Sequence, residues 1–251
     1  MLSSQRKQYI LDTLRRDGQI VAKTLSQELG LSEDTIRRDL RELAQEGLLQ
    51  RVHGGALPAS PAVADFAARQ ALSGEAKVAI GRAAAERIQP GQVVMLDGGT
   101  TAIQVARHLP PHLEATIVTH SPSVAVELAH HRHVEVILIG GRLFKHSVVA
   151  VGSAALEAIR RVRADLYYLG VTGLHPQAGL TTGDLEEAHI KRALSEQAAE
   201  TVALASAEKL NAASPYQVAP ITELSGIITE RAVPAQATEA FERLGIPVLR
   251  V

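Results

Sequence analysis

Two glycines followed by two threonines occupy residues 98–101, directly after an apolar run at residues 93–96 and before a stretch with helical periodicity. Glycines let a backbone approach an anion closely, threonine hydroxyls donate hydrogen bonds, and the start of a helix offers unpaired N–H groups. Together these features suit a phosphate monoester. An ordinary strand-to-helix turn has the same composition, so this segment alone leaves both interpretations open.

Three further apolar runs end in polar or glycine-rich segments of the same kind. They are Thr119-His120-Ser121-Pro122, Gly140-Gly141-Arg142 and Gly170-Val171-Thr172-Gly173. In a parallel sheet the loops that follow successive strands lie at the carboxyl edge, where ligands bind. Four such loops at one edge favour a ligand site over four unrelated turns.

Glu187 and Lys191 are four residues apart in a helix that is predicted to begin near Asp184. On an exposed helix face this spacing gives an ion pair worth about a few tenths of a kcal/mol. The functional alternative has Lys191 facing a sugar phosphate across the cleft that the loops would form.

A basic helix face is predicted near the N-terminus, at residues 33–46. On a helical wheel with about 100° per residue, Ile36, Leu40 and Leu43 share one narrow arc. The opposite arc carries Thr35, Arg37, Arg38 and Arg41. Such a helix suits the major groove of DNA, where arginine grips guanine bidentately. The alternative is a solvated helix whose arginines pair with Asp34, Asp39 and Glu42.

Composition narrows the classes of function. The chain has 26 Lys+Arg against 27 Asp+Glu and a net charge of -1, so any basic surface must be local. Aromatic residues make up 3% and tryptophan is absent, which disfavours recognition of single strands by stacking. The absence of cysteine excludes disulfides, zinc fingers, iron–sulfur clusters and cysteine nucleophiles.

No metal, no cofactor and no membrane segment are expected. The cluster His130, His131 and His133 has only Glu127 and Glu135 nearby, and fits a solvated helix end better than a metal site. No apolar run approaches the roughly 20 residues of a membrane span. The N-terminus lacks the apolar core of a signal peptide, so we expect a soluble, cytoplasmic protein.

The elements that position the basic helix form a compact unit at residues 1–57. Helices are predicted at residues 5–16, with Ser4 as N-cap, at residues 23–29, and at residues 33–46, with Ser32 as N-cap. Residues 48–52 and those after Gly54-Gly55 would form a β-hairpin. A linker at residues 58–73 is predicted from its proline and alanine content.

Residues 74–251 are predicted to form a mostly parallel α/β domain. Its apolar runs are continuous rather than alternating, which is typical of strands buried on both faces. The predicted strands span residues 93–96, 116–118, 134–139, 166–169, 202–204, 226–228 and 248–251. Helical stretches lie between most of them, for example at residues 77–88, 123–130 and 185–199.

Two segments resemble the signature of the DeoR-type bacterial repressors: residues 29–40, LGLSEDTIRRDL, and residues 51–56, RVHGGA. That family joins an N-terminal winged helix-turn-helix to a C-terminal domain that senses sugar phosphates. The sensing domain is similar to ribose-5-phosphate isomerase and related sugar-phosphate enzymes. The resemblance covers nearly the full chain and implies a repressor of a carbohydrate-metabolism operon, released from its operator by a phosphorylated sugar or sugar acid.

The resemblance also carries site residues. Residues 97–101 look like the family's phosphate loop, and residues 184–193 look like its stretch of two acidic residues followed by a lysine. The chain departs from the family at His120, where asparagine is usual, and at Ser206, where an acid usually precedes the lysine that is Lys209 here. Both positions are expected to line the effector cleft, so the effector class depends on them.

The sequence thus predicts two sites. The candidates for contact with DNA are Ser32, Thr35, Arg37, Arg38, Arg41, Arg51 and His53, the last two reaching the flanking backbone or minor groove. The candidates for contact with the effector are Asp97, Gly98, Gly99, Thr100, Thr101, Thr119, His120, Ser121, Gly140, Gly141, Glu187, Lys191 and Lys209. The partners expected are double-stranded operator DNA, a sugar phosphate, and further copies of the chain in a homodimer or homotetramer.

An enzymatic alternative stays open at this point. An isomerase acting on sugar phosphates needs a carboxylate base beside the substrate carbons. Glu187 is one such carboxylate, but no second acid cluster on a loop accompanies it. Whether a regulator of this type represses or activates is not decided by the sequence.

Overall fold

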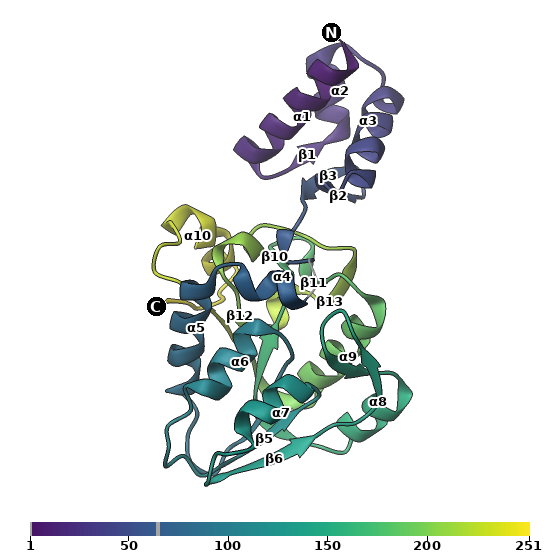
Figure 1. The fold of residues 1–251 in the computed structure, drawn as a ribbon. Coiled ribbons are helices and arrows are strands. Elements are labelled where there is room, and N and C mark those ends of the chain that lie inside the picture. Colours follow the sequence, from purple (N-terminus) through teal and green to yellow (C-terminus); the bar gives the residue numbers. More distant parts are fainter. Residues whose placement is uncertain (1, 64–65) are drawn as a thin grey trace.

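The computed structural model describes residues 2–63 and 66–251. Its N-terminal part is a three-helix unit with a small antiparallel sheet (Figure 1). Its elements are α1 (Ser3–Asp17), β1 (Ile20–Val21), α2 (Ala22–Leu29), α3 (Glu33–Gln45), β2 (Leu49–Val52) and β3 (Gly55–Pro58). The strands pair in the order β1-β3-β2, and the helices enclose one hydrophobic core. The predicted winged helix-turn-helix is confirmed.

Two details of this unit differ from the prediction. Ser4 is not an N-cap, because α1 begins at Ser3 and the side chain of Gln5 accepts a hydrogen bond from the backbone of Leu2 at 3.2 Å. Strand β1 was not predicted, because two residues are too few to show a period. Ser32 does cap α3, and its hydroxyl accepts from the N–H of Thr35 at 3.2 Å.

The C-terminal domain is built on a seven-stranded parallel sheet in the order β15-β14-β12-β9-β4-β5-β6. All seven predicted strands are present. Their bounds are β4 (Val93–Leu96), β5 (Ala115–Thr119), β6 (Val134–Leu138), β9 (Ala164–Gly170), β12 (Ala198–Leu204), β14 (Gly226–Thr229) and β15 (Val248–Arg250). The order reverses at the centre, since the chain proceeds outward from β4 to β6 and then outward from β9 to β15.

Helices cover both faces of this sheet (Figure 1). Helices α5 (Gly74–Ala85), α6 (Thr100–Arg107) and α7 (Pro122–Leu128) supply one hydrophobic cluster together with Val94, Leu96 and Tyr168. Helices α8 (Ser153–Ile159), α9 (Leu185–Glu196) and α10 (Ala235–Arg243) supply the other with Met95 and Tyr167. Successive strand residues thus enter opposite clusters, which explains their continuous apolar runs.

Short antiparallel strands lie at the carboxyl side of the sheet. They were not predicted from the sequence. They are the hairpin of β7 (Arg142–Phe144) with β8 (Val149–Val151), and the small sheet of β10 (Gly173–His175), β11 (Gly179–Thr182) and β13 (Tyr216–Ala219). Each has three or four residues and is bounded by turn residues, so no alternating pattern develops. The loops after β6 and β9 lead into these hairpins.

In the segment predicted as a linker, residues 58–73, the structure describes residues 58–63 and 66–73, and several of these contact the C-terminal domain. The segment contains the 3-10 turn η1 (Pro61–Val63) and helix α4 (Phe66–Ala71), and Phe66 packs against the cluster under α5 and α6. Ser60 is buried. Proline and alanine suggested a free spacer, but the tertiary contacts of these few residues fix them on the C-terminal domain.

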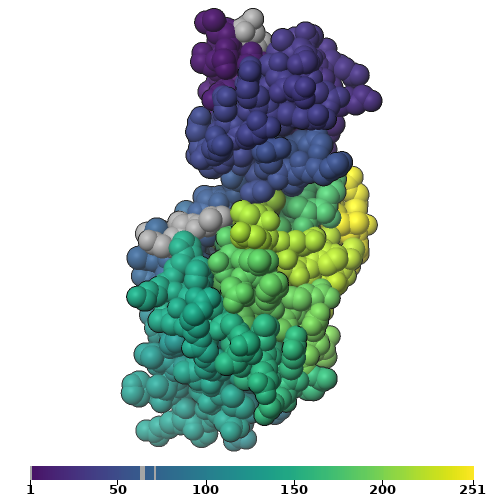
Figure 2. Space-filling view, turned by 90° about the vertical axis from the view of Figure 1, so that its right-hand side faces the viewer, coloured from purple at the N-terminus to yellow at the C-terminus, as the bar shows by residue number. Residues whose placement is uncertain are grey.

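The N-terminal domain stands on one end of the larger domain (Figure 2). Its wing and β1 face Gln177 and Ala178, at the tip of the β10–β11 hairpin, across a groove of about 340 Å³. Among the described residues, no helix has the length and hydrophobicity that crossing a membrane requires.

Candidate functional site

The first candidate site is the exposed face of α3. Ile36, Leu40 and Leu43 are buried in the core of the N-terminal domain, as the helical wheel predicted. Arg37, Arg38 and Arg41 are exposed on the opposite side, with Thr35 half-buried beside them and the capping Ser32 exposed. On the wing, Arg51 and His53 are also exposed. The helix therefore presents one continuous polar and basic face.

Ion pairs distinguish the three arginines of α3. Arg37 pairs with Glu33 at 2.6 Å and with Asp34 at 3.6 Å. Across residues 2–63 and 66–251, neither Arg38 nor Arg41 makes an ion pair. These two guanidinium groups are the ones most available to a phosphate or a base.

Asp39 and Glu42 do not pair with those arginines, contrary to the solvated-helix alternative. Asp39 is buried and accepts hydrogen bonds from Arg6 of α1, one of them at 3.0 Å. Glu42 pairs with Lys7 of α1 at 3.0 Å. Both acids therefore hold α3 against α1 and leave Arg38 and Arg41 without a carboxylate partner among the described residues.

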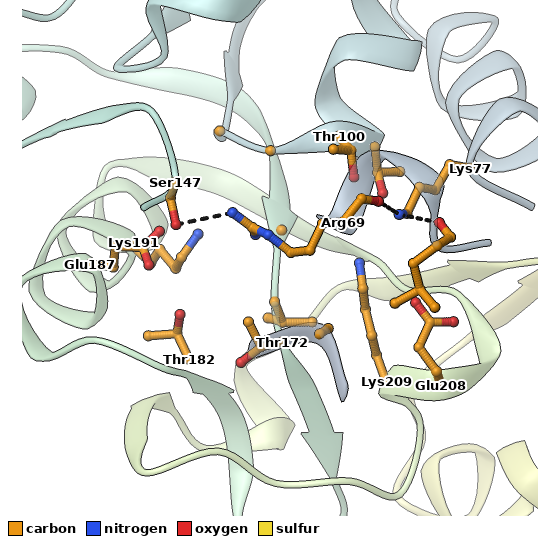
Figure 3. A pocket seen from close by; sticks show the side chains of 17 residues that line it. Arg69, Lys77, Thr100, Ser147, Thr172, Thr182, Glu187, Lys191, Glu208 and Lys209 are labelled. Atoms are coloured by element: carbon orange, nitrogen blue, oxygen red, sulfur yellow. Dashed lines mark hydrogen bonds between the residues drawn. The ribbon is translucent and has the colours of Figure 1, made fainter. Parts of the chain in front are cut away.

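The second candidate site is a pocket at the carboxyl ends of β4 and β9, where the strand order reverses. Ligands in open parallel sheets bind at such a point because the two outgoing loops diverge there. The pocket is lined by Ala62, Arg69, Leu72, Lys77, Gly98, Gly99, Thr100, Thr101, Ser147, Gly170, Val171, Thr172, Thr182, Glu187, Lys191, Glu208 and Lys209 (Figure 3). Its free volume is about 30 Å³.

The glycine-rich loop after β4 has two glycines for two different reasons. A Cβ at Gly98 would lie 2.1 Å from Cγ1 of Val149, so the β7–β8 hairpin packs directly on the loop. Gly99 has φ +102°, a conformation that side chains disfavour. The loop then leads into the N-terminus of α6, with Thr100 and Thr101 facing the pocket.

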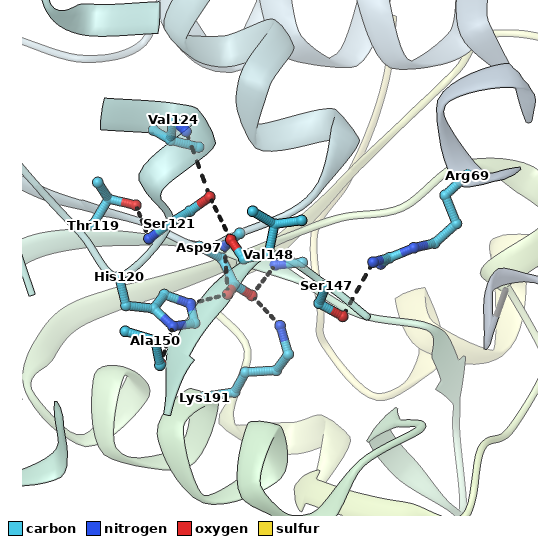
Figure 4. Close-up of polar contacts among 12 residues, drawn as sticks. Arg69, Asp97, Thr119, His120, Ser121, Val124, Ser147, Val148, Ala150 and Lys191 are labelled. Carbon is cyan, nitrogen blue, oxygen red and sulfur yellow. Dashed lines mark hydrogen bonds and ion pairs between the residues drawn. The ribbon is translucent and has the colours of Figure 1, made fainter. Parts of the chain in front are cut away.

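Asp97 lies beneath this loop and is fully buried (Figure 4). Its Oδ1 accepts from His120 Nε2 at 2.9 Å and from the N–H of Gly98 at 2.8 Å. Its Oδ2 accepts from Lys191 Nζ at 2.6 Å and from the N–H of Gly170 at 2.8 Å. Burial alone would raise the pKa of Asp97, but the charge of Lys191 and the contact with His120 outweigh it and hold that pKa well below its usual range.

Cationic side chains outnumber carboxylates around the pocket. Arg69, Lys77, Lys191 and Lys209 line it, against Glu187 and Glu208. The pKa of Lys209 is lowered to about 8, chiefly because the side chain is buried; Glu208 opposes this effect, and the neighbouring cations add to it. Positive charge held close together in a buried site favours an anionic ligand.

Comparison with known proteins identifies the family of both domains. A DeoR-like helix-turn-helix domain matches residues 6–61, and the DeoR C terminal sensor domain matches residues 73–231. The chain belongs to the DeoR family of transcriptional regulators. The match to the sensor domain contains most of the pocket, so we call the C-terminal domain the sensor domain from here on.

Relatives match this DeoR-family chain over nearly its whole length. The HTH-type transcriptional regulator GlpR of Haloferax volcanii is 38% identical over 99% of this chain and 98% of its own. The glycerol-3-phosphate regulon repressor of Escherichia coli K12 is 31% identical over 96% of both chains. A structure of ribose 5-phosphate isomerase A from Methanocaldococcus jannaschii matches with a TM-score of 0.39 and 15% identity, covering 53% of this chain and 52% of that chain. Since the full-length relatives are transcription regulators, the isomerase alternative is set aside.

Several predicted effector residues lie outside the pocket of this DeoR-family chain. Thr119, His120 and Ser121 are fully buried after β5, and Ser121 caps α7. Gly140 and Gly141 are exposed after β6, at the edge of the sheet. These loops do follow the carboxyl ends of their strands, as predicted. They do not meet at the pocket, because the pocket lies between β4 and β9 and not between β4 and β6.

Both departures from the family pattern also lie off the pocket wall, contrary to expectation. His120 sits behind Asp97, and its Nδ1 faces the carbonyl of Ala150 at 3.0 Å. Ser206 is fully buried and donates to Glu208 at 2.5 Å. His120 and Ser206 can therefore influence a ligand in the pocket only through Asp97 and Glu208, respectively. Asp97 likewise lies off the pocket wall, where it accepts hydrogen bonds from Lys191 and from the two flanking loops.

Sequence reasoning missed the contribution of α4 and α5. Arg69 of α4 extends across the pocket and donates to Ser147 Oγ at 3.1 Å (Figure 3). Lys77 of α5 donates to the carbonyls of Arg69 and Leu72 and so holds the end of α4 in place. One indication of this contribution was present in the sequence, a single arginine in an alanine-rich segment. It was overlooked because the segment was predicted to be a linker.

Proposed function

We propose that this DeoR-family regulator is a repressor of a carbohydrate-metabolism operon, and that a phosphorylated sugar or sugar acid bound in the sensor domain releases it from its operator. The observation that carries the proposal is the pocket, where four cationic side chains face two carboxylates beside a glycine-rich loop and a helix N-terminus. In this proposal the phosphate lies at Gly98, Gly99 and Thr100, and Lys191 and Lys209 neutralise it.

A thermal-shift panel tests the choice of ligand class. Glycerol 3-phosphate belongs to it because a relative is named for the glycerol-3-phosphate regulon. Glucose 6-phosphate and ribose 5-phosphate extend the panel, and glycerol, glucose and ribose are the matched controls. A ligand at 100 times its dissociation constant adds about 2.7 kcal/mol to the free energy of unfolding. Stabilisation by the unphosphorylated compounds alone would contradict the proposal.

We propose that the N-terminal domain reads operator DNA in the major groove through α3, with the wing on the adjacent backbone. Ser32, Thr35, Arg37, Arg38 and Arg41 then contact the groove and its phosphates. Arg51 and His53 contact the flanking phosphates or the minor groove. Because one winged helix spans only a few base pairs, the active form in this proposal is a homodimer or homotetramer acting in the cytoplasm, and sedimentation velocity tests the assembly.

The variant Arg38→Ala/Arg41→Ala is expected to bind operator DNA at least about 30-fold more weakly than the wild type, since each arginine contact contributes about 1–3 kcal/mol. Arg37→Ala is expected to lose less, because Arg37 already pairs with Glu33. Fluorescence anisotropy at fixed salt measures the affinity for a selected duplex and for its scrambled version.

Arg15→Ala is the matched control, because Arg15 is exposed on α1 and pairs with Asp12 of the same helix. It is expected to bind within about twofold of the wild type, as is usual for a surface charge away from the groove. Unchanged binding by the Arg38/Arg41 variant would refute the assignment of α3.

Raising the pH through about 8 is expected to weaken the binding of a sugar phosphate. The pKa of Lys209 is lowered to about 8 by burial, and a bound anion stabilises its protonated form. Affinity is therefore highest below that pH and declines above it, while the phosphate keeps its charge because its second pKa is about 6. Calorimetry on either side of pH 8 measures this, and Lys209→Met should abolish the dependence. A constant affinity in the wild type would contradict the role of Lys209.

A further inference from the structure

The connecting segment, defined here as residues 58–63 and 66–72, leads directly from the wing into the pocket of the sensor domain. Pro58 is the last residue of β3. Only four residues later, Ala62 lines the pocket, and Arg69 and Leu72 line it again. The wall of the proposed effector site is thus partly made by the chain that carries the DNA-binding domain.

The start of this segment is held on two residues of the sensor domain. Ala59 forms a parallel bridge with Ala213, whose N–H donates to the carbonyl of Pro58 at 3.0 Å. The hydroxyl of Ser60 donates to the carbonyl of Thr172, a residue of the pocket wall. Ser60 is only two residues from Pro58 at the end of the wing, so a displacement of Thr172 would move the backbone next to the wing.

The other end of the segment divides one cleft into two cavities. The bond from Arg69 to Ser147 closes a cavity of about 30 Å³ on one side, and an adjoining cavity of about 140 Å³ lies on the other. Ala62, Arg69, Ser147, Thr172 and Glu187 line both. The inner cavity holds about one or two water molecules, far less than the several hundred Å³ of usual ligand sites. A sugar phosphate enters only if Arg69 leaves Ser147.

The loop that receives Arg69 is itself held under strain. Val148 follows Ser147 and has φ +55°, which is an outlier for a β-branched residue. The carbonyl of His146 accepts from the N–H of Phe66 at 2.9 Å, so the loop contacts α4 at a second point. The closed arrangement therefore includes these two contacts between α4 and the loop.

We infer that Arg69 couples effector binding to the DNA-binding domain: an anion in the pocket draws the guanidinium away from Ser147, and the connecting segment moves with the wing attached. This rests on the proposed function. The guanidinium meets a neutral acceptor at Ser147, whereas a phosphate offers an opposite charge and two oxygens for bidentate hydrogen bonds, so an anion outcompetes the Ser147 hydroxyl. Because Arg69 contacts the anion only in the open arrangement, the ligand binds that arrangement more tightly and shifts the population toward it.

A reversible lock tests the movement of the segment. The variant Ala59→Cys/Ala213→Cys places two cysteines at an isolated β-bridge, where paired backbones lie about 4.8 Å apart and within the span of a disulfide. The chain has no other cysteine, so this is its only disulfide. The probes are inorganic phosphate, glycerol 3-phosphate, glucose 6-phosphate and ribose 5-phosphate, with probe binding followed by calorimetry and operator release by anisotropy on the full chain.

The oxidised lock is expected to bind operator and probe, yet to show operator affinities that agree within about twofold with and without the probe. Reduction should restore the release seen in the wild type. Release by the oxidised protein at the wild-type probe concentration would overturn the inference. If the wild type binds none of the probes, the proposed function fails first, and calorimetry identifies that outcome separately.

Two single substitutions test Arg69 in opposite directions. Arg69→Gln is expected to retain operator binding and to lose probe-dependent release. Ser147→Ala weakens the closed state and is expected to release the operator at a probe concentration about 10- to 100-fold lower than the wild type, the range for one hydrogen bond with a charged partner. Arg82→Gln, on the exposed face of α5, is the control and should respond as the wild type does. Full release by Arg69→Gln at saturating probe would refute the coupling role.

Discussion

Replacing Lys191 by alanine is expected to lower the free energy of unfolding by about 3–5 kcal/mol, because it leaves a buried carboxylate without its counter-charge. Asp97 is fully buried, and Lys191 donates to its Oδ2 at 2.6 Å. The hydrogen bonds from His120, Gly98 and Gly170 remain in the variant, so the missing ammonium accounts for the loss. Urea denaturation followed by circular dichroism measures it.

Two variants separate this charge effect from a loss of packing. Asp97→Asn/Lys191→Met removes both charges and is expected to recover most of the stability, as replacement of a whole buried pair usually does. Arg192→Ala, at the next position of α9, breaks the more exposed pairs with Glu196 and Glu223 and should cost about 1 kcal/mol or less. A Lys191→Ala protein as stable as the wild type would show that the pair is not needed for folding.

Lys209→Met is expected to lower the affinity for a sugar phosphate about 10- to 100-fold, because a hydrogen bond to a charged group contributes about 1.5–3 kcal/mol. Lys209 is buried at the pocket wall and makes no ion pair with the residues that the structure describes. Operator affinity without the ligand should stay within about twofold of the wild type, because α3 and the wing lie in the other domain. Calorimetry and anisotropy measure the two affinities.

Arg163→Met is the matched control for Lys209→Met. Arg163 is exposed and directly precedes β9, so it lies at the amino end of the strand whose carboxyl end forms the pocket. Removing this charge changes the net charge of the sensor domain equally without touching the pocket. If both variants lose affinity to the same extent, the effect is one of overall charge, and the placement of the phosphate near Lys209 is wrong.

The continuous apolar runs were sufficient to predict every strand of the parallel sheet. Burial on both faces imposes a run such as Val93–Leu96 whatever the strand's neighbours are, so the signal is local. The face of α3 is local in the same way, since Ile36, Leu40 and Leu43 follow the helical period. A local rule also explains the ends of helices at Gly18 and Gly30, which have φ +72° and +64°.

The sequence by itself therefore determined the fold class, the strands of the parallel sheet, the basic face of α3 and the position of the glycine-rich loop after β4, while the tertiary structure alone decided which side chains share the pocket. The order of strands brings the loop after β4 next to the loop after β9, and leaves Gly140 at the edge of the sheet. It also brings Arg69 to Ser147, 78 positions along the chain. Neighbours in a parallel sheet are set by long crossover connections and by packing on both faces, and the period of a single segment carries no information about either.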